Sequence, residues 1–116
     1  MHIEIKRGKE MPVVIITFHT RSDRFDSEYD KSKFFRELHG WKQTVPGNGK
    51  RYTYARKGVL SEVPHIKVSD STFIVPSAEA KTLIEYMEEW ADKVEFEMLD
   101  MMMRQREFMR RLANEL

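Results

Sequence analysis

The stretch MPVVIITFHT, residues 11–20, is the feature that most constrains the fold of this chain. It is rich in β-branched residues and almost continuously apolar, which is typical of a central strand covered on both faces. A chain of 116 residues is long enough to bury one core around such a strand but too short for two independent cores. We therefore expect a single domain over residues 1–116, with residues 1–10 as an N-terminal extension or a short edge strand.

Two helices and three or four further strands are predicted downstream. The first helix spans about residues 31–39 and ends at Gly40, a usual left-handed stop. The second begins at Ser77 as N-cap and repeats apolar residues at helical spacing as far as Val94. Between the two helices, WKQTV, the turn PGNG and KRYTYAR predict a hairpin, and residues 65–76 supply one strand or two short ones.

The carboxyl-terminal part has two interpretations. Apolar residues alternate with glutamates in VEFEML, residues 94–99, which predicts a strand, and Asp100 would then cap a last helix. However, neither Gly nor Pro occurs between Ser77 and Leu116, and a heptad pattern runs through the same residues. The alternative is therefore one long helix that forms a coiled-coil arm. We favour the strand because short elements match the usual make-up of domains.

With that strand, the expected fold is α+β, a ferredoxin-like split βαβ of order β-α-β-β-α-β. This core would occupy residues 11–99, and an additional C-terminal helix, which could serve dimerisation, would occupy residues 100–116. Two helices would cover one face of the sheet, and the other face would be left for solvent, a ligand or a second subunit.

The segment VSDSTFIVPSAEAKTLIEYMEEW, residues 68–90, is similar in layout to the third strand and second helix of the Cas2 and VapD-like group of small ferredoxin-fold proteins. The resemblance covers roughly residues 11–99 and is mainly topological. It implies a homodimer joined through its sheets, acting either as a metal-dependent nuclease or as a structural part of a nucleic-acid integration complex. The nuclease proposal for that group needs an aspartate at the end of the first strand. This chain has Thr17, Phe18 and His19 there, and the nearest carboxylate is Asp23.

The second strand of the predicted hairpin combines cations with tyrosines. Because the whole chain has a net charge of only +1, any affinity for a polyanion has to come from such a local patch. Stacking of bases on the tyrosines and neutralisation of phosphates by the cations predict contact with single-stranded or structured RNA or DNA, without chemistry. The alternative is that the tyrosines pack against a helix or a partner while the cations stay solvated. The candidate residues are Lys50, Arg51, Tyr52, Tyr54, Arg56 and Lys57.

An acidic loop follows the first predicted strand. Carboxylates at the carboxyl end of a strand are where Mg²⁺ or Mn²⁺ could bind and activate water, and His19 is the one histidine placed to act as a general base. The second functional hypothesis is accordingly a Cas2-like metal-dependent endonuclease, with Asp23, Asp26 and His19 as catalytic candidates; without that activity we expect no cofactor. Alternatively, Asp30 caps the next helix and its neighbours are hydrated. The candidate metal ligands are Asp23, Asp26, Glu28 and Asp30.

Methionines are concentrated near the carboxyl end, and flexible thioethers suit an adaptable interface. The third hypothesis is therefore a protein-interaction module that uses a Met-rich C-terminal helix, although the same residues could lie on the protein's own sheet. We also expect a homodimer, because a small split βαβ domain has an open sheet face and edge. The chain has no cysteine, and its longest apolar run, Val13 to Ile16, is far below the roughly 20 residues of a membrane span. These features predict a cytoplasmic protein without membrane contact. The methionines concerned are Met98, Met101, Met102, Met103 and Met109.

Overall fold

The computed structural model describes residues 9–114 and shows an α+β fold with a C-terminal helix, as predicted. The predicted N-terminal extension or edge strand falls mostly on residues 1–8 and lies outside the described part. In chain order the elements are β1 (Glu10–Thr20), η1 (Ser22–Arg24), α1 (Glu28–His39), β2 (Trp41–Gly47), β3 (Lys50–Arg56), η2 (Val59–Glu62), β4 (Ile66–Ser69), β5 (Thr72–Pro76), η3 (Ser77–Glu79), α2 (Lys81–Glu89), β6 (Val94–Arg104) and α3 (Gln105–Asn114), where η denotes a 3₁₀ turn.

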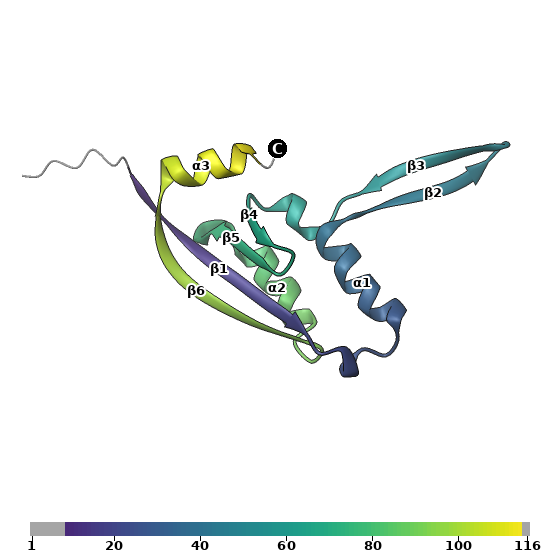
Figure 1. Cartoon of the computed structure of the whole chain (residues 1–116), viewed down its shortest axis with the longest axis horizontal. Coiled ribbons are helices and arrows are strands. Elements are labelled where there is room, and N and C mark those ends of the chain that lie inside the picture. Colours follow the sequence, from purple (N-terminus) through teal and green to yellow (C-terminus); the bar gives the residue numbers. More distant parts are fainter. Residues whose placement is uncertain (1–8, 115–116) are drawn as a thin grey trace, which may run out of the picture.

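The strands form two separate sheets (Figure 1). The larger sheet has the order β4-β5-β1-β6, with every neighbouring pair antiparallel. This order is consistent with the predicted split βαβ plan. Strand β5 lies between β1 and β4, whose connection contains α1, and strand β1 lies between β5 and β6, which α2 connects. The hairpin β2-β3 takes no part in this sheet and forms a two-stranded sheet of its own.

Strand β1 lies inside the larger sheet and is covered on both faces, which confirms the prediction made from its apolar sequence. It pairs with β5 on one side and along all of its 11 residues with β6 on the other. Val14, Ile16 and Phe18 belong to the main core, whereas Val13 belongs to a second cluster on the opposite face. Successive side chains of a strand point to opposite faces, so this alternation needs an apolar residue at nearly every position.

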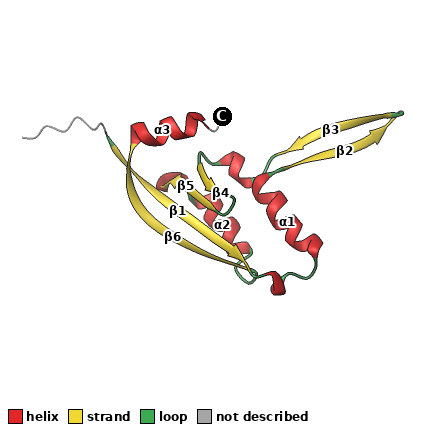
Figure 2. Cartoon of the chain, in the orientation of Figure 1, coloured by secondary structure: helices red, strands yellow, loops and turns green. Residues whose placement is uncertain are grey.

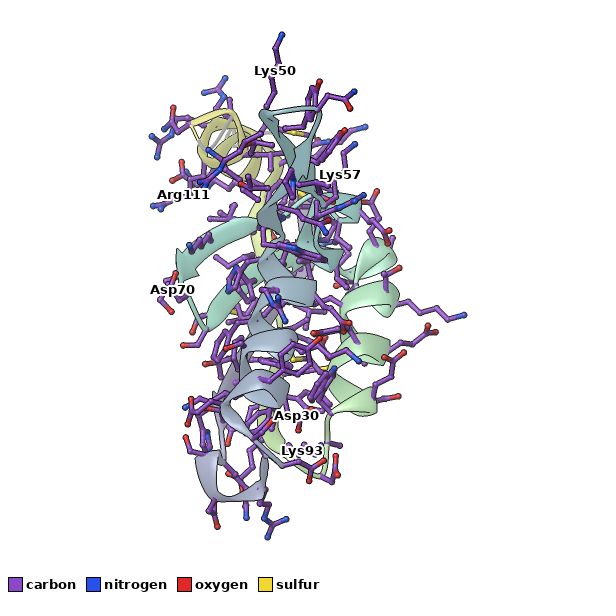
Figure 3. All side chains as sticks on the ribbon, turned by 90° about the vertical axis from the view of Figure 1, so that its right-hand side faces the viewer. Asp30, Lys50, Lys57, Asp70, Lys93 and Arg111 are labelled. Carbon is purple, nitrogen blue, oxygen red and sulfur yellow. The ribbon has the colours of Figure 1, made fainter. Side chains whose placement is uncertain are left out.

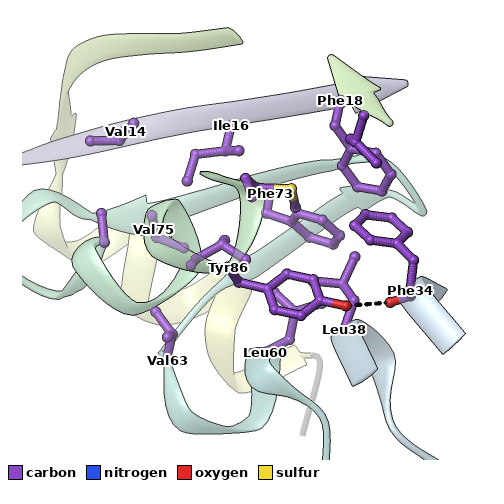
Figure 4. Close-up of a cluster of buried hydrophobic side chains, with 14 residues drawn as sticks. Val14, Ile16, Phe18, Phe34, Leu38, Leu60, Val63, Phe73, Val75 and Tyr86 are labelled. Carbon is purple, nitrogen blue, oxygen red and sulfur yellow. Dashed lines mark hydrogen bonds between the residues drawn. The ribbon is translucent and has the colours of Figure 1, made fainter. Parts of the chain in front are cut away.

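The main core lies between one face of the larger sheet and the helices α1 and α2 (Figures 2 and 4). Phe34 and Leu38 of α1 are fully buried there with Leu83 and Met87 of α2. The Tyr86 hydroxyl crosses this layer and donates a 2.6 Å hydrogen bond to the carbonyl oxygen of Phe34. Burial of aromatic and aliphatic side chains therefore holds the two helices on the sheet.

The opposite face of the sheet is partly covered by α3. Phe108 of this helix is buried against Val13 and Ile66, and Met103 and Leu112 pack around them. The last helix thus packs on the protein's own sheet.

The carboxyl-terminal strand is longer than predicted. The strand expected at residues 94–99 exists but continues to Arg104, and α3 begins at Gln105, so a helix cap at Asp100 is wrong. The physical reason is the pairing partner, since the first residues of β1 extend the ladder and place Glu10 opposite Arg104. The single long helix is also wrong, because α2 ends at Glu89 and residues 90–93 form a turn.

Two helix starts also differ from the predictions. Helix α1 begins at Glu28, three residues before the predicted residue 31, with Ser27 as its N-cap; the Ser27 hydroxyl accepts a 3.1 Å hydrogen bond from the Asp30 backbone N–H. Ser77 is not an N-cap, because it opens the turn η3 without a side-chain cap and α2 starts only at Lys81. The predicted stop at Gly40 is confirmed, since this residue has φ +87° and donates its N–H to the Arg36 carbonyl at 2.7 Å.

Candidate nucleic-acid interface

The hairpin β2-β3 projects from the body of the molecule between α1 and η2 (Figure 1). All seven residues of β3 are exposed, and Tyr52 and Tyr54 keep 44% and 49% of their surface accessible. The two tyrosines are therefore not buried against a helix of the described chain. The principal extents of 72 × 36 × 19 Å reflect this elongated arrangement.

A two-residue turn closes the hairpin. Asn48 and Gly49 have φ angles of 47° and 73°, and Gly47 is paired with Lys50 across them. Positive φ at both central residues is characteristic of the type I′ turn, whose twist matches that of the flanking strands. The sequence predicted a turn in PGNG, and the structure narrows it to Asn48-Gly49, with Pro46 and Gly47 inside β2.

The register of the hairpin gives it two different faces. Residues directly opposite each other in an antiparallel pair point to the same side, and the pairs are Trp41 with Arg56, Gln43 with Tyr54 and Val45 with Tyr52. One side therefore carries three aromatic residues and a valine, and we call it the aromatic face: Trp41, Gln43, Val45, Tyr52, Tyr54 and Arg56. The other side carries Lys42, Thr44, Pro46, Arg51, Thr53 and Ala55.

The sequence identified Tyr52, Tyr54 and Arg56 as candidate binding residues of the hairpin but missed Trp41 and Val45. Only the cross-strand register shows that these β2 residues join the tyrosines. The register follows from the two-residue turn, because a turn of that length fixes which residues lie opposite. The Asn-Gly dipeptide was thus the sequence signal from which the positions of Trp41 and Val45 beside the tyrosines could have been predicted.

Arg56 is held over the aromatic face. Its Nε donates a 2.8 Å hydrogen bond to the Gln43 side-chain oxygen, and its guanidinium carbon lies 5.8 Å from the centre of the Tyr54 ring. At the base of the hairpin, the guanidinium of Arg36 in α1 lies 5.8 Å from the centre of the Trp41 ring. Both distances are within the range of cation–π attraction.

Two glycines form the neck through which the hairpin leaves the body. A Cβ atom on Gly58 would lie 2.4 Å from both the Gly40 nitrogen and the Leu38 carbonyl oxygen. A Cβ atom on Gly40 would lie 2.6 Å from the Arg56 carbonyl oxygen, and its φ of +87° also favours glycine. The backbones entering and leaving the hairpin can approach this closely because neither residue has a side chain.

The hairpin concentrates positive charge. Residues 41–57 contain five lysines and arginines and no carboxylate, so they carry a net charge of +5. The whole chain has a net charge of +1, and the remaining residues therefore carry −4. Within residues 9–114 these cations form no salt bridge, and Figure 3 shows Lys50 at the tip of the hairpin and Lys57 at its base. A polyanion would meet no competing carboxylate on this element.

Two carboxylates of the acidic loop, those of Asp26 and Asp30, contact the same lysine. Lys93 Nζ lies 2.7 Å from an Asp30 carboxylate oxygen and 3.5 Å from an Asp26 carboxylate oxygen. The hydrogen bond from Lys93 holds the pKa of Asp30 below its usual value, and Asp30 also accepts a 3.2 Å hydrogen bond from the Asp26 backbone N–H. Asp30 thus connects the first turn of α1 to Lys93 and to the Asp26 backbone, whereas the side chain that caps the helix is that of Ser27.

The remaining catalytic and metal candidates are spread over several elements. Asp23 lies in η1 and Glu28 opens α1. His19 stands at the end of β1, with its Nε2 2.7 Å from a carboxylate oxygen of Glu95, which also pairs with Arg21. Among residues 9–114, no three histidine, aspartate or glutamate side chains converge in a group that could hold a metal ion.

The methionines do not form one helical stripe. Met98, Met101 and Met102 lie on β6 and are exposed, whereas Met103 packs beneath α3. Met109, on α3, is also exposed. The structure therefore moves most of the predicted Met-rich surface from a helix to a strand at the edge of the sheet.

A hollow of about 540 Å³, which the sequence did not reveal, lies between the end of α1, η2 and β4. Its polar wall includes His39 and His65, and Lys67 pairs with Asp70 at 2.8 Å. Burial lowers the pKa of His39, so this imidazole favours its neutral form.

Comparison of the chain with models of protein families, with curated proteins and with solved structures found no match. The resemblance to the Cas2 and VapD-like group stays a prediction from the sequence. No helix within residues 9–114 is long and apolar enough to cross a membrane.

Proposed function

We propose that this protein binds single-stranded or structured nucleic acid through the projecting hairpin and performs no chemistry on it. The observation that carries the proposal is the exposed aromatic face of an element with five cations and no carboxylate. Bases would stack on Tyr52 and Tyr54, at about 1–3 kcal/mol per stacked base. Phosphates would be neutralised by the cations at the tip and base of the hairpin: Lys50, Arg51, Arg56 and Lys57.

The exposure of the hairpin supports a role in binding. A two-stranded hairpin alone is at best marginally stable in water, and this one buries none of its β3 residues against the body. An element of that kind contributes little to the core, so its aromatic and cationic composition needs another reason. Contact with a polyanion would supply that reason, because phosphates attract the cations and bases stack on the tyrosines.

No observation favours the nuclease as a second function. Asp26 and Asp30 both contact Lys93, and His19 contacts Glu95. The proposal therefore contains no metal ion and no catalytic residue.

Fluorescence anisotropy with labelled single-stranded RNA, single-stranded DNA and a duplex tests the proposal. We expect binding at low salt that weakens as salt rises, with a slope of log K against log salt of about −0.7 for each phosphate contacted on a single strand. The variant Tyr52→Ala/Arg56→Ala should weaken binding at least tenfold, because it removes one stacking ring and one cation.

The matched control is Tyr29→Ala/Lys81→Ala. It also removes one tyrosine and one cation, but both are highly exposed and lie on α1 and α2 rather than on the hairpin. Binding should be unchanged in this variant. Absence of binding at low salt, or an equal loss in both double variants, would refute the proposal.

A further inference from the structure

The hollow of about 540 Å³ between α1, η2 and β4 adjoins the neck of the hairpin. His39, the last residue of α1, lines the hollow and directly precedes Gly40, and Ser61 lines it three residues after Gly58. The close backbone contact between the two glycines places η2 beside the end of α1. The hollow therefore lies next to the point where the chain leaves the hairpin, at Lys57 (Figure 3).

Aromatic rings form one wall of the hollow. The rings of Phe35 and His39, one helical turn apart on α1, are almost parallel, with an angle of 3° between their planes and 6.4 Å between their centres. The rings of His39 and His65 also lie against the buried ring of Phe73, with centres 5.9 and 6.1 Å from it. Such ring faces are a surface on which another planar ring can stack.

Two polar side chains of the wall are held by the backbone of their own loop. Ser61 Oγ donates a 2.7 Å hydrogen bond to the Gly58 carbonyl oxygen, and His65 Nδ1 lies 2.8 Å from the Val63 carbonyl oxygen. Because a carbonyl oxygen only accepts, the proton of the neutral His65 ring is on Nδ1, and Nε2 carries the lone pair. The Ser61 oxygen also keeps lone pairs after donating its proton. The wall therefore offers hydrogen-bond acceptors to the N–H groups of a ligand.

The charges of the wall do not favour an anion. The lysine and the carboxylate among the described residues that line the hollow, Lys67 and Asp70, pair with each other at 2.8 Å. Burial lowers the pKa of His39, so this ring favours its neutral form. A phosphate would gain little attraction here, whereas an uncharged planar ring with N–H groups would meet both a stacking surface and acceptors.

We propose that the hollow binds one unpaired nucleobase of a strand held by the hairpin and prefers a base with an exocyclic amino group. The inference rests on the proposed function, because the hairpin brings the strand to the hollow. A volume of about 540 Å³ falls in the usual range of sites for small ligands. A base within a duplex has its edge paired and its faces stacked, so only a single-stranded or flipped-out base can enter.

The preference among bases follows from the acceptors of the wall. Adenine, guanine and cytosine carry an amino group that can donate to Ser61 Oγ and His65 Nε2. Uracil and thymine carry carbonyl oxygens instead, and their single ring N–H can satisfy only one of these acceptors. The hollow would thus add selectivity to a hairpin that contacts phosphates and stacks any base.

Nuclear magnetic resonance of the histidine rings tests the hollow separately from the hairpin. Adenosine, cytidine and uridine lack phosphate, so their binding does not depend on the cations of the hairpin. We expect saturable shifts of the His39 and His65 ring protons with adenosine or cytidine, and about fivefold weaker binding of uridine, the effect of one lost hydrogen bond. The signal of His19, at the end of β1, is the control and should not move. Unmoved His39 and His65 signals, or equal binding of uridine, would overturn the inference.

Fluorescence anisotropy with oligo(dC) and oligo(dU) of equal length tests the link to the strand. His65→Phe removes the acceptor and keeps a ring beside Phe73, so it should weaken binding of oligo(dC) about fivefold and of oligo(dU) little. The control His19→Phe should change neither, and Tyr52→Ala/Arg56→Ala should weaken both.

The outcomes distinguish the hollow from the hairpin. If the hairpin variant weakens both oligonucleotides and His65→Phe weakens neither, or both equally, the inference about the hollow is overturned while the proposed function stands. If adenosine shifts the His39 and His65 signals but no oligonucleotide binds, the base site in the hollow is supported and the proposed function is refuted.

Discussion

At the scale of single residues, the neck of the hairpin depends on two positions without side chains. Gly58 has an ordinary extended backbone, with φ −94° and ψ 176°, which any residue can adopt. Glycine is needed at this position because a Cβ atom would clash with neighbouring atoms. The atoms that a Cβ would meet are backbone atoms of residues 38–40, which cannot rotate away as a flexible side chain could.

We expect Gly58→Ala to lower the free energy of unfolding by about 1–3 kcal/mol, because the added methyl group overpacks the neck. Urea denaturation followed by circular dichroism measures this change. Gly47→Ala is the control, since its Cβ would meet only the Tyr52 ring, at 3.2 Å. If the two variants were equally stable, close backbone contact would not be what constrains the neck.

Tyr86 joins the two helices through one buried hydroxyl group. We expect Tyr86→Phe to lower the free energy of unfolding by about 1 kcal/mol, the usual net contribution of such a hydrogen bond. Thermal denaturation of the two proteins at neutral pH measures it. No difference in stability would contradict a role for this hydrogen bond.

The same tyrosine predicts a dependence on alkaline pH. Burial raises the pKa of Tyr86 well above its usual value of 10.0, so the folded state resists deprotonation more than the unfolded state does. The unfolded state therefore binds fewer protons above about pH 10, and stability falls as the pH rises further. We expect the stability difference between the unmodified protein and Tyr86→Phe to shrink as pH rises from 9 to 11. A constant difference would contradict it.

At the scale of elements, the boundary between β6 and α3 decides what the carboxyl-terminal residues can do. Residues 100–104 pair with β1 and so belong to the sheet. Helix α3 then packs on the sheet face opposite to α1 and α2. Within α3, hydrogen bonds from Arg110 and Arg111 lower the pKa of Glu107 to about 2. The stabilisation from this carboxylate is present above its unfolded value of 4.5 and is lost as pH falls towards 2.

We expect Phe108→Ala to lower the free energy of unfolding by about 3–5 kcal/mol, because Phe108 is 1% exposed and fills the cluster beneath α3. Its neighbour Met109 is 51% exposed, so Met109→Ala should change stability by less than about 0.5 kcal/mol. Denaturation of both variants distinguishes two models, in which α3 is either packed on the protein's own sheet or free to act as a recognition helix. A negligible effect of Phe108→Ala would favour the latter.

At the scale of the whole molecule, charge and apolar surface are distributed to different regions. The hairpin carries a net charge of +5, and the rest of the chain carries −4. The exposed methionines of β6 lie away from it (Figure 1). The cationic hairpin and the exposed apolar residues of β6 are therefore separate regions of one small protein.

Deleting the hairpin should separate binding from folding. Trp41 and Arg56 lie opposite each other, as do Gly47 and Lys50 around the natural turn, so Asn-Gly in place of residues 42–55 reproduces a two-residue turn. We expect this variant to keep the helical and strand signals of the body and to lose nucleic-acid binding. Circular dichroism and the anisotropy measurement check the two halves of this expectation. A deletion that unfolds the body would show that the hairpin is part of the core after all.

Local patterns predicted much of this fold. The apolar β-branched run predicted the central strand, PGNG (residues 46–49) predicted the hairpin turn, and Gly40 predicted the end of α1. Each of these depends on the period of side chains along an element or on the φ angle that one residue can adopt. The candidate binding residues of the hairpin were predicted in the same way, and the structure adds that Tyr52 and Tyr54 are exposed to solvent.

What the sequence by itself determined is therefore the central strand, the two helices that cover it, the hairpin and the charge of the hairpin, while residues 94–99 stayed open between a strand and part of a long helix. Tertiary structure alone decided that β6 continues to Arg104, that Trp41 and Val45 join the tyrosines, and that the acidic loop is organised around Lys93. The physical reason is that each of these depends on which residue lies opposite or alongside in space. Such pairings form between residues distant in the chain, and no local periodicity records them.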